Sequence, residues 1–172
     1  AEYLESLGFS RLILERELSL EQIRKIRKAV SCELEFFVHG ALCVCYSGQC
    51  YLSEHIAGRS ANRGACIQAC RSRYDLTDGS GKVLVKDKAL LYLKEYNLRR
   101  RMEELADAGI CSFKIEGRLK DRDYVTNIVA YYRQLLDQLI DSTPELQHAS
   151  TASIYHYNFT PNPTKTFHRG KT

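Results

Sequence analysis

The sequence contains no apolar run that approaches the roughly 20 residues needed to cross a bilayer, which excludes a membrane-spanning helix. Its first ten residues, AEYLESLGFS, carry two acids and no apolar core, so we expect no signal peptide. Short internal repeats and low-complexity tracts are absent as well. These absences predict a cytoplasmic protein without a membrane partner.

The composition is that of an ordinary folded domain. Hydrophobic residues make up 44% and charged residues 27% of 172 residues, which excludes wholesale disorder and allows one domain with a real core. The net charge of +4 is mildly basic. This charge fits a nucleic-acid partner and fits a slightly positive protein without one equally well.

Seven cysteines are too few, as a share of the chain, to reach the roughly 8–10% that marks a disulfide scaffold. Their number is odd and a secretory signal is lacking, which argues against a disulfide framework. The spacing of the thiols therefore carries more information than their number.

The order of predicted elements is that of an α/β protein. Helices are expected at 1–8, 19–30, 96–109 and from about 121 onward, with Ser19 and Gln22 forming a capping box. Strands are expected at 9–17, 32–40 and 110–118, and a β-hairpin at 73–87 turns at Asp78–Gly79–Ser80–Gly81. Strands that alternate with helices imply a parallel sheet.

A complete (β/α) barrel of the TIM type needs about 250 residues, and this chain supplies about three strands and opens on a helix. We therefore expect the carboxyl-side part of an interrupted TIM-type barrel over residues 1–140, with a cysteine-rich insert at about 40–73. The amino-terminal barrel portion of the same protein would be missing. Residues 141–172 are expected to be a polar tail or the start of a following segment. A small self-contained α/β sandwich is the alternative.

The strand CELEFFVHG predicts one apolar and one polar face. Its alternation places Leu34, Phe36 and Val38 under helices, and Glu35 and His39 on the opposite face. On the later strand, Lys114 and Glu116 share a face and Arg118 follows. Because barrel sites form at the carboxyl ends of strands, these polar residues are candidates for a substrate site; a Lys114–Glu35 or Lys114–Glu116 ion pair is the structural alternative. The candidate catalytic residues are Glu35, His39, Lys114, Glu116 and Arg118.

Four cysteines in the insert have a spacing that suits one soft metal centre. Cys43 and Cys50 precede the pair Cys66 and Cys70, and four thiolates from one irregular segment can hold an iron–sulfur cluster or a structural zinc. Cys45 could replace Cys43 as a ligand. Cys32 and Cys111 are expected to be ordinary packed cysteines.

The segment EFFVHGALCVCYSGQCYLS resembles the signature of peptidase family U-32, the collagenase-like proteases. The match includes Gly40, Cys43, Cys50 and Ser53, and the likeness continues through GRSANRGACIQACRSRY and SFKIEGRLKDRDYV. The resemblance implies an interrupted TIM-type barrel that begins upstream of this chain. In several branches it implies a [4Fe-4S] cluster on four cysteines, matched by position to Cys43, Cys50, Cys66 and Cys70. The branch most similar to this chain hydroxylates bases of ribosomal or transfer RNA.

Two other functions remain open at this point. The family name implies a peptidase, in which Cys43 or Cys50 would pair with His39 or His55, although neither an HExxH nor a GxSxG motif occurs. A non-enzymatic zinc-binding module would use the same four thiols. For the RNA hypothesis, arginines that flank the cysteines are candidates for phosphate contact, or are simply solvated: Arg59, Arg63, Arg71 and Arg73.

Overall fold

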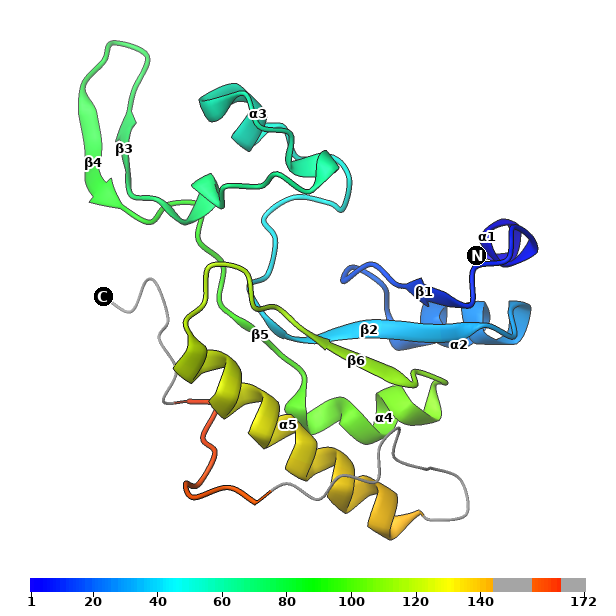
Figure 1. The fold of residues 1–172 in the computed structure, drawn as a ribbon. Helices are drawn as coiled ribbons and strands as arrows, with labels where there is room; N and C mark the ends of the chain where they lie inside the picture. Colours follow the sequence, from blue (N-terminus) through cyan, green and yellow to red (C-terminus); the bar gives the residue numbers. More distant parts are fainter. Residues whose placement is uncertain (144–155, 165–172) are drawn as a thin grey trace. The chain divides into compact units, whose positions relative to one another are not determined.

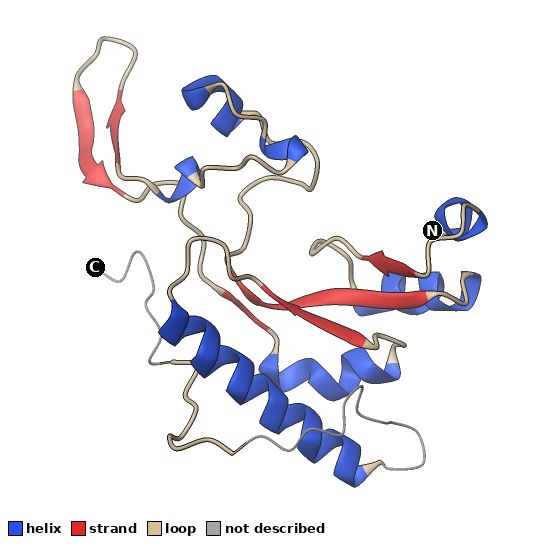
Figure 2. Ribbon diagram, viewed as in Figure 1, coloured by secondary structure: helices blue, strands red, loops and turns tan. Residues whose placement is uncertain are grey.

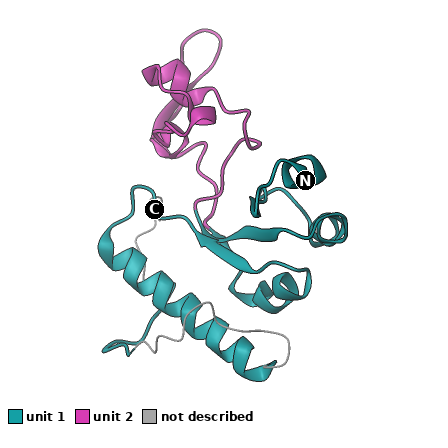
Figure 3. Cartoon of the chain, turned by 45° about the vertical axis from the view of Figure 1, so that its right-hand side comes forward, with its two compact units in different colours: residues 1–40, 96–167 teal, residues 41–95, 168–172 magenta. Residues whose placement is uncertain are grey.

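The computed structural model describes residues 1–143 and 156–164, and these residues form two compact units (Figure 3). Unit 1 contains residues 1–40 together with the described residues from 96 onward. Unit 2 contains residues 41–95. Unit 2 is thus inserted in the chain between two parts of unit 1, and the predicted insert at about 40–73 lies inside this longer insertion.

The sheet of unit 1 is built around one central strand, β2 (Glu33–Gly40). Strands β1 (Arg11–Ile13) and β6 (Ser112–Ile115) run parallel to β2, with Leu12 opposite Leu34 and Phe36 opposite Phe113. Because Glu35 pairs with both strands, β1 and β6 lie at opposite edges of β2. The predicted parallel sheet is confirmed. In the described part of the chain the sheet is open and forms no closed barrel.

Helices α2 (Leu20–Ala29), α4 (Met102–Asp107) and α5 (Arg122–Ser142) cover one face of this sheet (Figures 1 and 2). Ser19 and Gln22 form the predicted capping box at the start of α2. Asp121 caps α5 by accepting the Tyr124 N–H. The short helix α1 (Glu2–Ser6) precedes the sheet.

The predicted helix at 96–109 is wrong in its first half. Tyr96–Asn97 forms strand β5, antiparallel to the end of β2, and Arg99–Arg101 forms the 3₁₀ turn η3 before α4 begins at Met102. A two-residue strand has no periodicity of its own, so its pairing with Gly40 depends on the fold around it.

The core of unit 1 lies between the helices and the sheet. Leu34, Phe36 and Val38 of β2 are fully buried, and they pack with Ile23 of α2 and Ile128 of α5. Each such side chain contributes about 1.5–3 kcal/mol through its burial. The predicted apolar face of β2 is therefore confirmed.

The alternation of β2 breaks at its carboxyl end. The pairing with β6 shifts between Phe37 and His39, a β-bulge. His39 is buried with the core residues, and its ring lies 5.5 Å from that of Tyr132 and 6.1 Å from that of Tyr124, both on α5. The expectation that His39 shares the polar face with Glu35 is thus wrong, because the bulge resets the period of two.

Unit 2 consists of a β-hairpin and three short helical segments. Strands β3 (Tyr74–Thr77) and β4 (Val83–Lys88) form the predicted antiparallel hairpin. The cysteine-rich stretch also contains helix α3 and the 3₁₀ turns η1 and η2, which the sequence pattern did not predict: Leu52–Ala57, Ala61–Arg63 and Ala69–Arg71.

The predicted tail at 141–172 falls partly outside the described residues. Its described portion, 156–164, docks on α5 through a reciprocal pair of hydrogen bonds between the Asn127 side chain and the Asn162 backbone, each 2.7 Å long. Among the described helices, none combines the length and the apolar character that a bilayer crossing requires.

Candidate functional site

Five of the seven cysteines lie in unit 2, and all seven are free thiols. Cys43, Cys45 and Cys50 are in the loop that precedes α3, while Cys66 and Cys70 flank and enter η2. Cys43 is exposed, and the other four thiols of unit 2 are partly buried. Cys32 and Cys111 belong to unit 1.

Ser53, on the first turn of α3, links this helix to Cys66. The side chain is 1% exposed, and its hydroxyl oxygen accepts the Ile67 N–H at 3.2 Å. The same hydroxyl donates to Cys66 Sγ at 3.8 Å, and the Gln68 N–H donates to that sulfur at 3.3 Å. The sulfur of Cys66 therefore accepts two hydrogen bonds, which stabilise negative charge on it.

The loops that carry the other cysteines are tied together by side chains of unit 2. Asn62 of η1 accepts the Cys50 N–H at 3.0 Å. Arg71 of η2 donates to the Leu42 carbonyl at 2.9 Å, next to Cys43, and its guanidinium lies 4.9 Å from the centre of the Tyr92 ring. These hydrogen bonds hold together segments of unit 2 that lie far apart in the sequence.

Cys70 is close enough to the other three predicted ligands to be influenced by them electrostatically. Burial raises the pKa of the Cys70 thiol above its usual value, Arg71 acts in the opposite direction, and nearby Cys43, Cys66 and Cys50 raise the pKa further. Burial, followed by the proximity of Cys50 and Cys43, raises the pKa of Cys45 as well. A positive charge at the centre of these thiols would reverse the effect, because it favours the thiolates.

The thiols match an iron–sulfur cluster or a zinc ion in their chemistry but not yet in their geometry. Four cysteines of one unit are a soft donor set of the right number for either group. Among residues 1–143 and 156–164, however, no group of three or more Cys, His, Asp or Glu side chains is close enough together to hold a metal ion. Binding would thus require the side chains to converge by movement of the loops that carry them.

A second polar cluster lies in unit 1, on the sheet face opposite the helices. Glu35 accepts a hydrogen bond from the Ser112 hydroxyl at 2.7 Å, and Lys114 Nζ and Arg11 Nη1 each lie 3.6 Å from its carboxylate. The Glu35 side chain is only 13% exposed. Of the two ion pairs considered as the structural alternative, Lys114–Glu35 is therefore present, whereas Glu116 pairs with Arg16.

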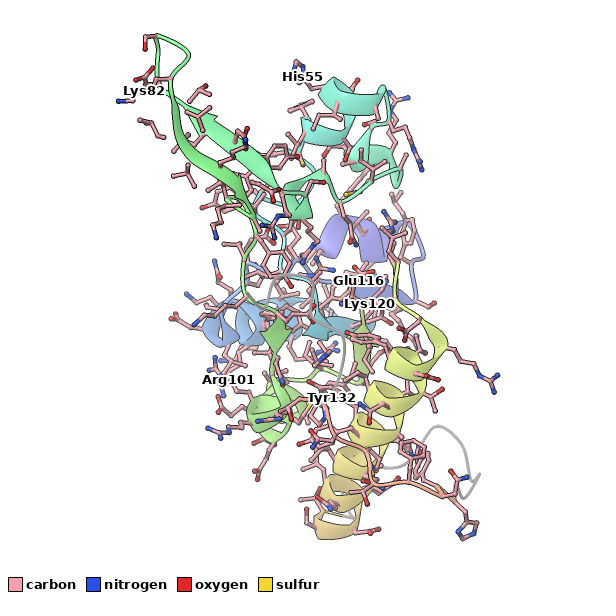
Figure 4. All side chains as sticks on the ribbon, turned by 90° about the vertical axis from the view of Figure 1, so that its left-hand side faces the viewer. His55, Lys82, Arg101, Glu116, Lys120 and Tyr132 are labelled. Carbon is pink, nitrogen blue, oxygen red and sulfur yellow. The ribbon has the colours of Figure 1, made fainter. Side chains whose placement is uncertain are left out.

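Glu116 occupies a fixed position at the carboxyl end of β6, where Figure 4 labels it near Lys120. Its Oε2 lies 3.1 Å from Nη2 of Arg16, and its Oε1 accepts the Arg118 N–H at 2.9 Å. Its side chain packs directly on Gly40, the last residue of β2. Both carboxylate oxygens are thus occupied, and Arg16 is a partner that the sequence pattern did not single out.

His39 contacts α5. Its Nδ1 lies 3.2 Å from the Tyr132 hydroxyl, which also donates to the Val38 carbonyl at 3.0 Å (Tyr132 is labelled in Figure 4). Burial raises the pKa of Tyr132, so its hydroxyl stays protonated at neutral pH. His39 therefore belongs to a buried network between the sheet and α5.

Of the four arginines near the cysteines, two are engaged within unit 2. Arg71 holds the Leu42 carbonyl, and Arg73 forms an ion pair of 2.8 Å with Asp87. Arg59 and Arg63 are exposed. These two are the flanking arginines best placed to meet a phosphate.

The contact between Ser53 and Cys66 predicts a measurable effect on unit 2. Ser53→Ala would leave the Ile67 N–H without its acceptor, at a cost of about 1–3 kcal/mol. We expect faster amide hydrogen exchange at Ile67 and Gln68. Ser72→Ala, a change at an exposed serine of the same unit, is the control and should leave both amides protected. Unchanged exchange in Ser53→Ala would contradict the link.

Comparison with known proteins places the chain in a family. The sequence profile of peptidase family U32 matches residues 1–172. The chain is similar to the 23S rRNA 5-hydroxycytidine C2501 synthase of Escherichia coli, with 51% identity over the whole chain and 26% of that relative. It is also similar to tRNA hydroxylation protein P1 of Bacillus subtilis, with 40% identity over 76% of the chain and 32% of that relative.

A third relative carries a different name. The Collagenase of Porphyromonas gingivalis is 34% identical over 77% of the chain and 35% of that relative. The chain thus spans about a quarter to a third of the length of these curated relatives. No solved structure matches.

Proposed function

The chain belongs to peptidase family U32, and from this premise we propose that the complete protein hydroxylates a base of ribosomal or transfer RNA. The observation that carries the proposal is the 51% identity, over all 172 residues, to a relative named for 5-hydroxycytidine synthesis in 23S rRNA. Relatives named for tRNA hydroxylation support the same reaction class. RNA is accordingly the proposed partner.

In the complete protein, unit 1 would form the carboxyl-side part of an interrupted TIM-type barrel. Three parallel strands with helices on one face and charged residues on the other support this architecture, because barrel helices lie outside and barrel sites lie at the carboxyl ends of the strands. Arg16, Gly40 and Glu116 all follow or end such strands. The much longer relatives leave room for the remaining strands.

Unit 2 would hold the cofactor. Cys43, Cys50, Cys66 and Cys70 are the proposed ligands of a [4Fe-4S] cluster, which would supply one-electron chemistry when bound. Ser53 and the Gln68 N–H would stabilise the charge on the sulfur of Cys66, and Asn62 and Arg71 would hold the ligand loops. A zinc ion on the same thiols is the alternative, and it would be colourless and redox-inactive.

In unit 1, Glu35, Lys114, Glu116 and Arg118 remain the proposed substrate-site residues. Glu35 and Lys114 would act as an ion pair, because each neutralises the charge of the other when no substrate is bound. His39 would contribute by holding the end of β2 against α5. This arrangement gives little support to a peptidase that uses His39 as its base, since its Nδ1 contacts Tyr132.

The test is an analysis of nucleosides from ribosomal and transfer RNA in a strain that lacks the gene. We expect one hydroxylated nucleoside to vanish and to return with the wild-type gene, because the proposed enzyme inserts its oxygen. Complementation with a Cys66→Ser/Cys70→Ser variant should fail, whereas Cys32→Ser should succeed. An unchanged nucleoside profile, together with release of peptides from denatured collagen by the purified protein, would favour the collagenase alternative.

A further inference from the structure

Arg16, between β1 and α2, is held in a fixed orientation on the polar face of unit 1. Its guanidinium carbon lies 3.8 Å from the centre of the Phe37 ring, the distance of a stacked pair. Its Nη2 lies 3.1 Å from Glu116 Oε2. The side chain is 19% exposed, so it is largely enclosed but still accessible.

The partner that holds Arg16 is itself immobilised. Glu116 accepts the Arg118 N–H with its second oxygen, and its side chain packs on Gly40. Glu116 therefore holds the edge of the Arg16 guanidinium, and the Phe37 ring supports one of its faces.

The position of this stack coincides with the end of the sheet where a barrel binds its substrate. Arg16 follows the carboxyl end of β1 by three residues, and Glu116 follows that of β6 by one. Lys114 Nζ lies 5.1 Å from the centre of the same Phe37 ring. A rigid, flat and positively charged surface is thus presented at the proposed substrate site.

We propose that Arg16 is a substrate-binding residue whose guanidinium plane stacks on a base of single-stranded RNA. Proteins that recognise unpaired RNA place splayed-out bases on aromatic rings and on arginine planes. A guanidinium that already lies on Phe37 and is anchored by Glu116 loses little freedom when a base stacks on it. The inference rests on the proposed function, since it assigns the RNA base to a named surface.

The test compares the binding of two labelled oligonucleotides to the complete protein: oligocytidine, and an abasic oligonucleotide of the same length. Both carry the same phosphates, so only the first reports base stacking. Arg16→Lys keeps the positive charge but removes the plane. We expect this variant to bind oligocytidine about tenfold more weakly and the abasic strand as wild type does.

Arg24→Lys, on the exposed side of α2, is the matched control and should change neither affinity. Equal affinities of Arg16→Lys and wild type for oligocytidine would overturn the stacking role. An equal loss for both strands would also overturn it, because the residue would then act through charge or stability. Failure of the wild-type protein to bind either strand would instead overturn the proposed function, and the Arg16 role with it.

Discussion

Replacing Cys66 and Cys70 together by serine is expected to abolish iron binding in the complete protein. Anaerobic reconstitution of the wild type should give broad absorption in the blue and about four irons per chain. The double variant loses two of the four proposed thiolate ligands, and Cys70 is influenced electrostatically by the other three. Iron content and visible absorption after desalting measure the result, and the expected loss is nearly complete.

Single changes and a metal analysis make this prediction specific. Cys43→Ser and Cys50→Ser should each lose the cluster, whereas Cys32→Ser and Cys111→Ser, outside unit 2, should keep it. The spacing left open whether Cys43 or Cys45 is the ligand. Cys45→Ser tests this choice, and we expect the variant protein to retain iron. Retention of iron by the double variant would refute the ligand assignment. A colourless protein with one zinc per chain would leave the assignment of the four cysteine ligands intact but refute the iron–sulfur cluster.

Gly40→Ala is expected to destabilise unit 1 strongly. Gly40 has a φ of +127°, a region that L side chains rarely adopt, and a Cβ at this position would overlap the Cβ of Glu116 and lie 3.2 Å from its Cα. Backbone strain and overpacking each cost about 1–3 kcal/mol, so we expect a total loss of about 2–6 kcal/mol. The midpoint of urea unfolding of the complete protein measures it.

Two controls separate the causes of this effect. Gly8 has a φ of +89° but nothing within 4 Å of a built Cβ, so Gly8→Ala should show only the backbone cost, about 1–2 kcal/mol. In a Glu116→Gly background the overlap with the Glu116 Cβ is removed and only the close approach to its Cα remains, so Gly40→Ala should become less costly. A Gly40→Ala variant as stable as the Gly8→Ala variant would show that the close approach of Glu116 is unimportant.

The contacts of Gly40 and Ser53 give physical reasons for two residues of the family signature. Gly40 permits the close approach of Glu116 and the positive φ at the end of β2. Ser53 connects α3 to the Ile67 backbone and to the sulfur of Cys66. Both residues matched the family signature in the sequence. Their structural roles could not be predicted from it, because each role depends on a contact with a segment 13 or more residues away.

Residues that act through local chemistry were predicted well. The capping box of α2, the start of α5 near residue 121, the hairpin of unit 2 and the buried face of β2 all follow from neighbours within a few positions. The short segments β5, η1 and η2 were missed, since two or three residues show no periodicity.

The sequence by itself determined the α/β class, the parallel strands and the membership of the family, because periodicity, caps and motifs are written along the chain. The four-cysteine ligand set stays a prediction from the spacing and the family resemblance. Only the tertiary structure decided that His39 turns to Tyr132 instead of Glu35, and that Arg16 pairs with Glu116 across 100 positions. A single bulge resets the faces of a strand, and an ion pair between distant residues depends on how the strands align side by side. Such alignment is a property of the packed sheet, and no local pattern encodes it.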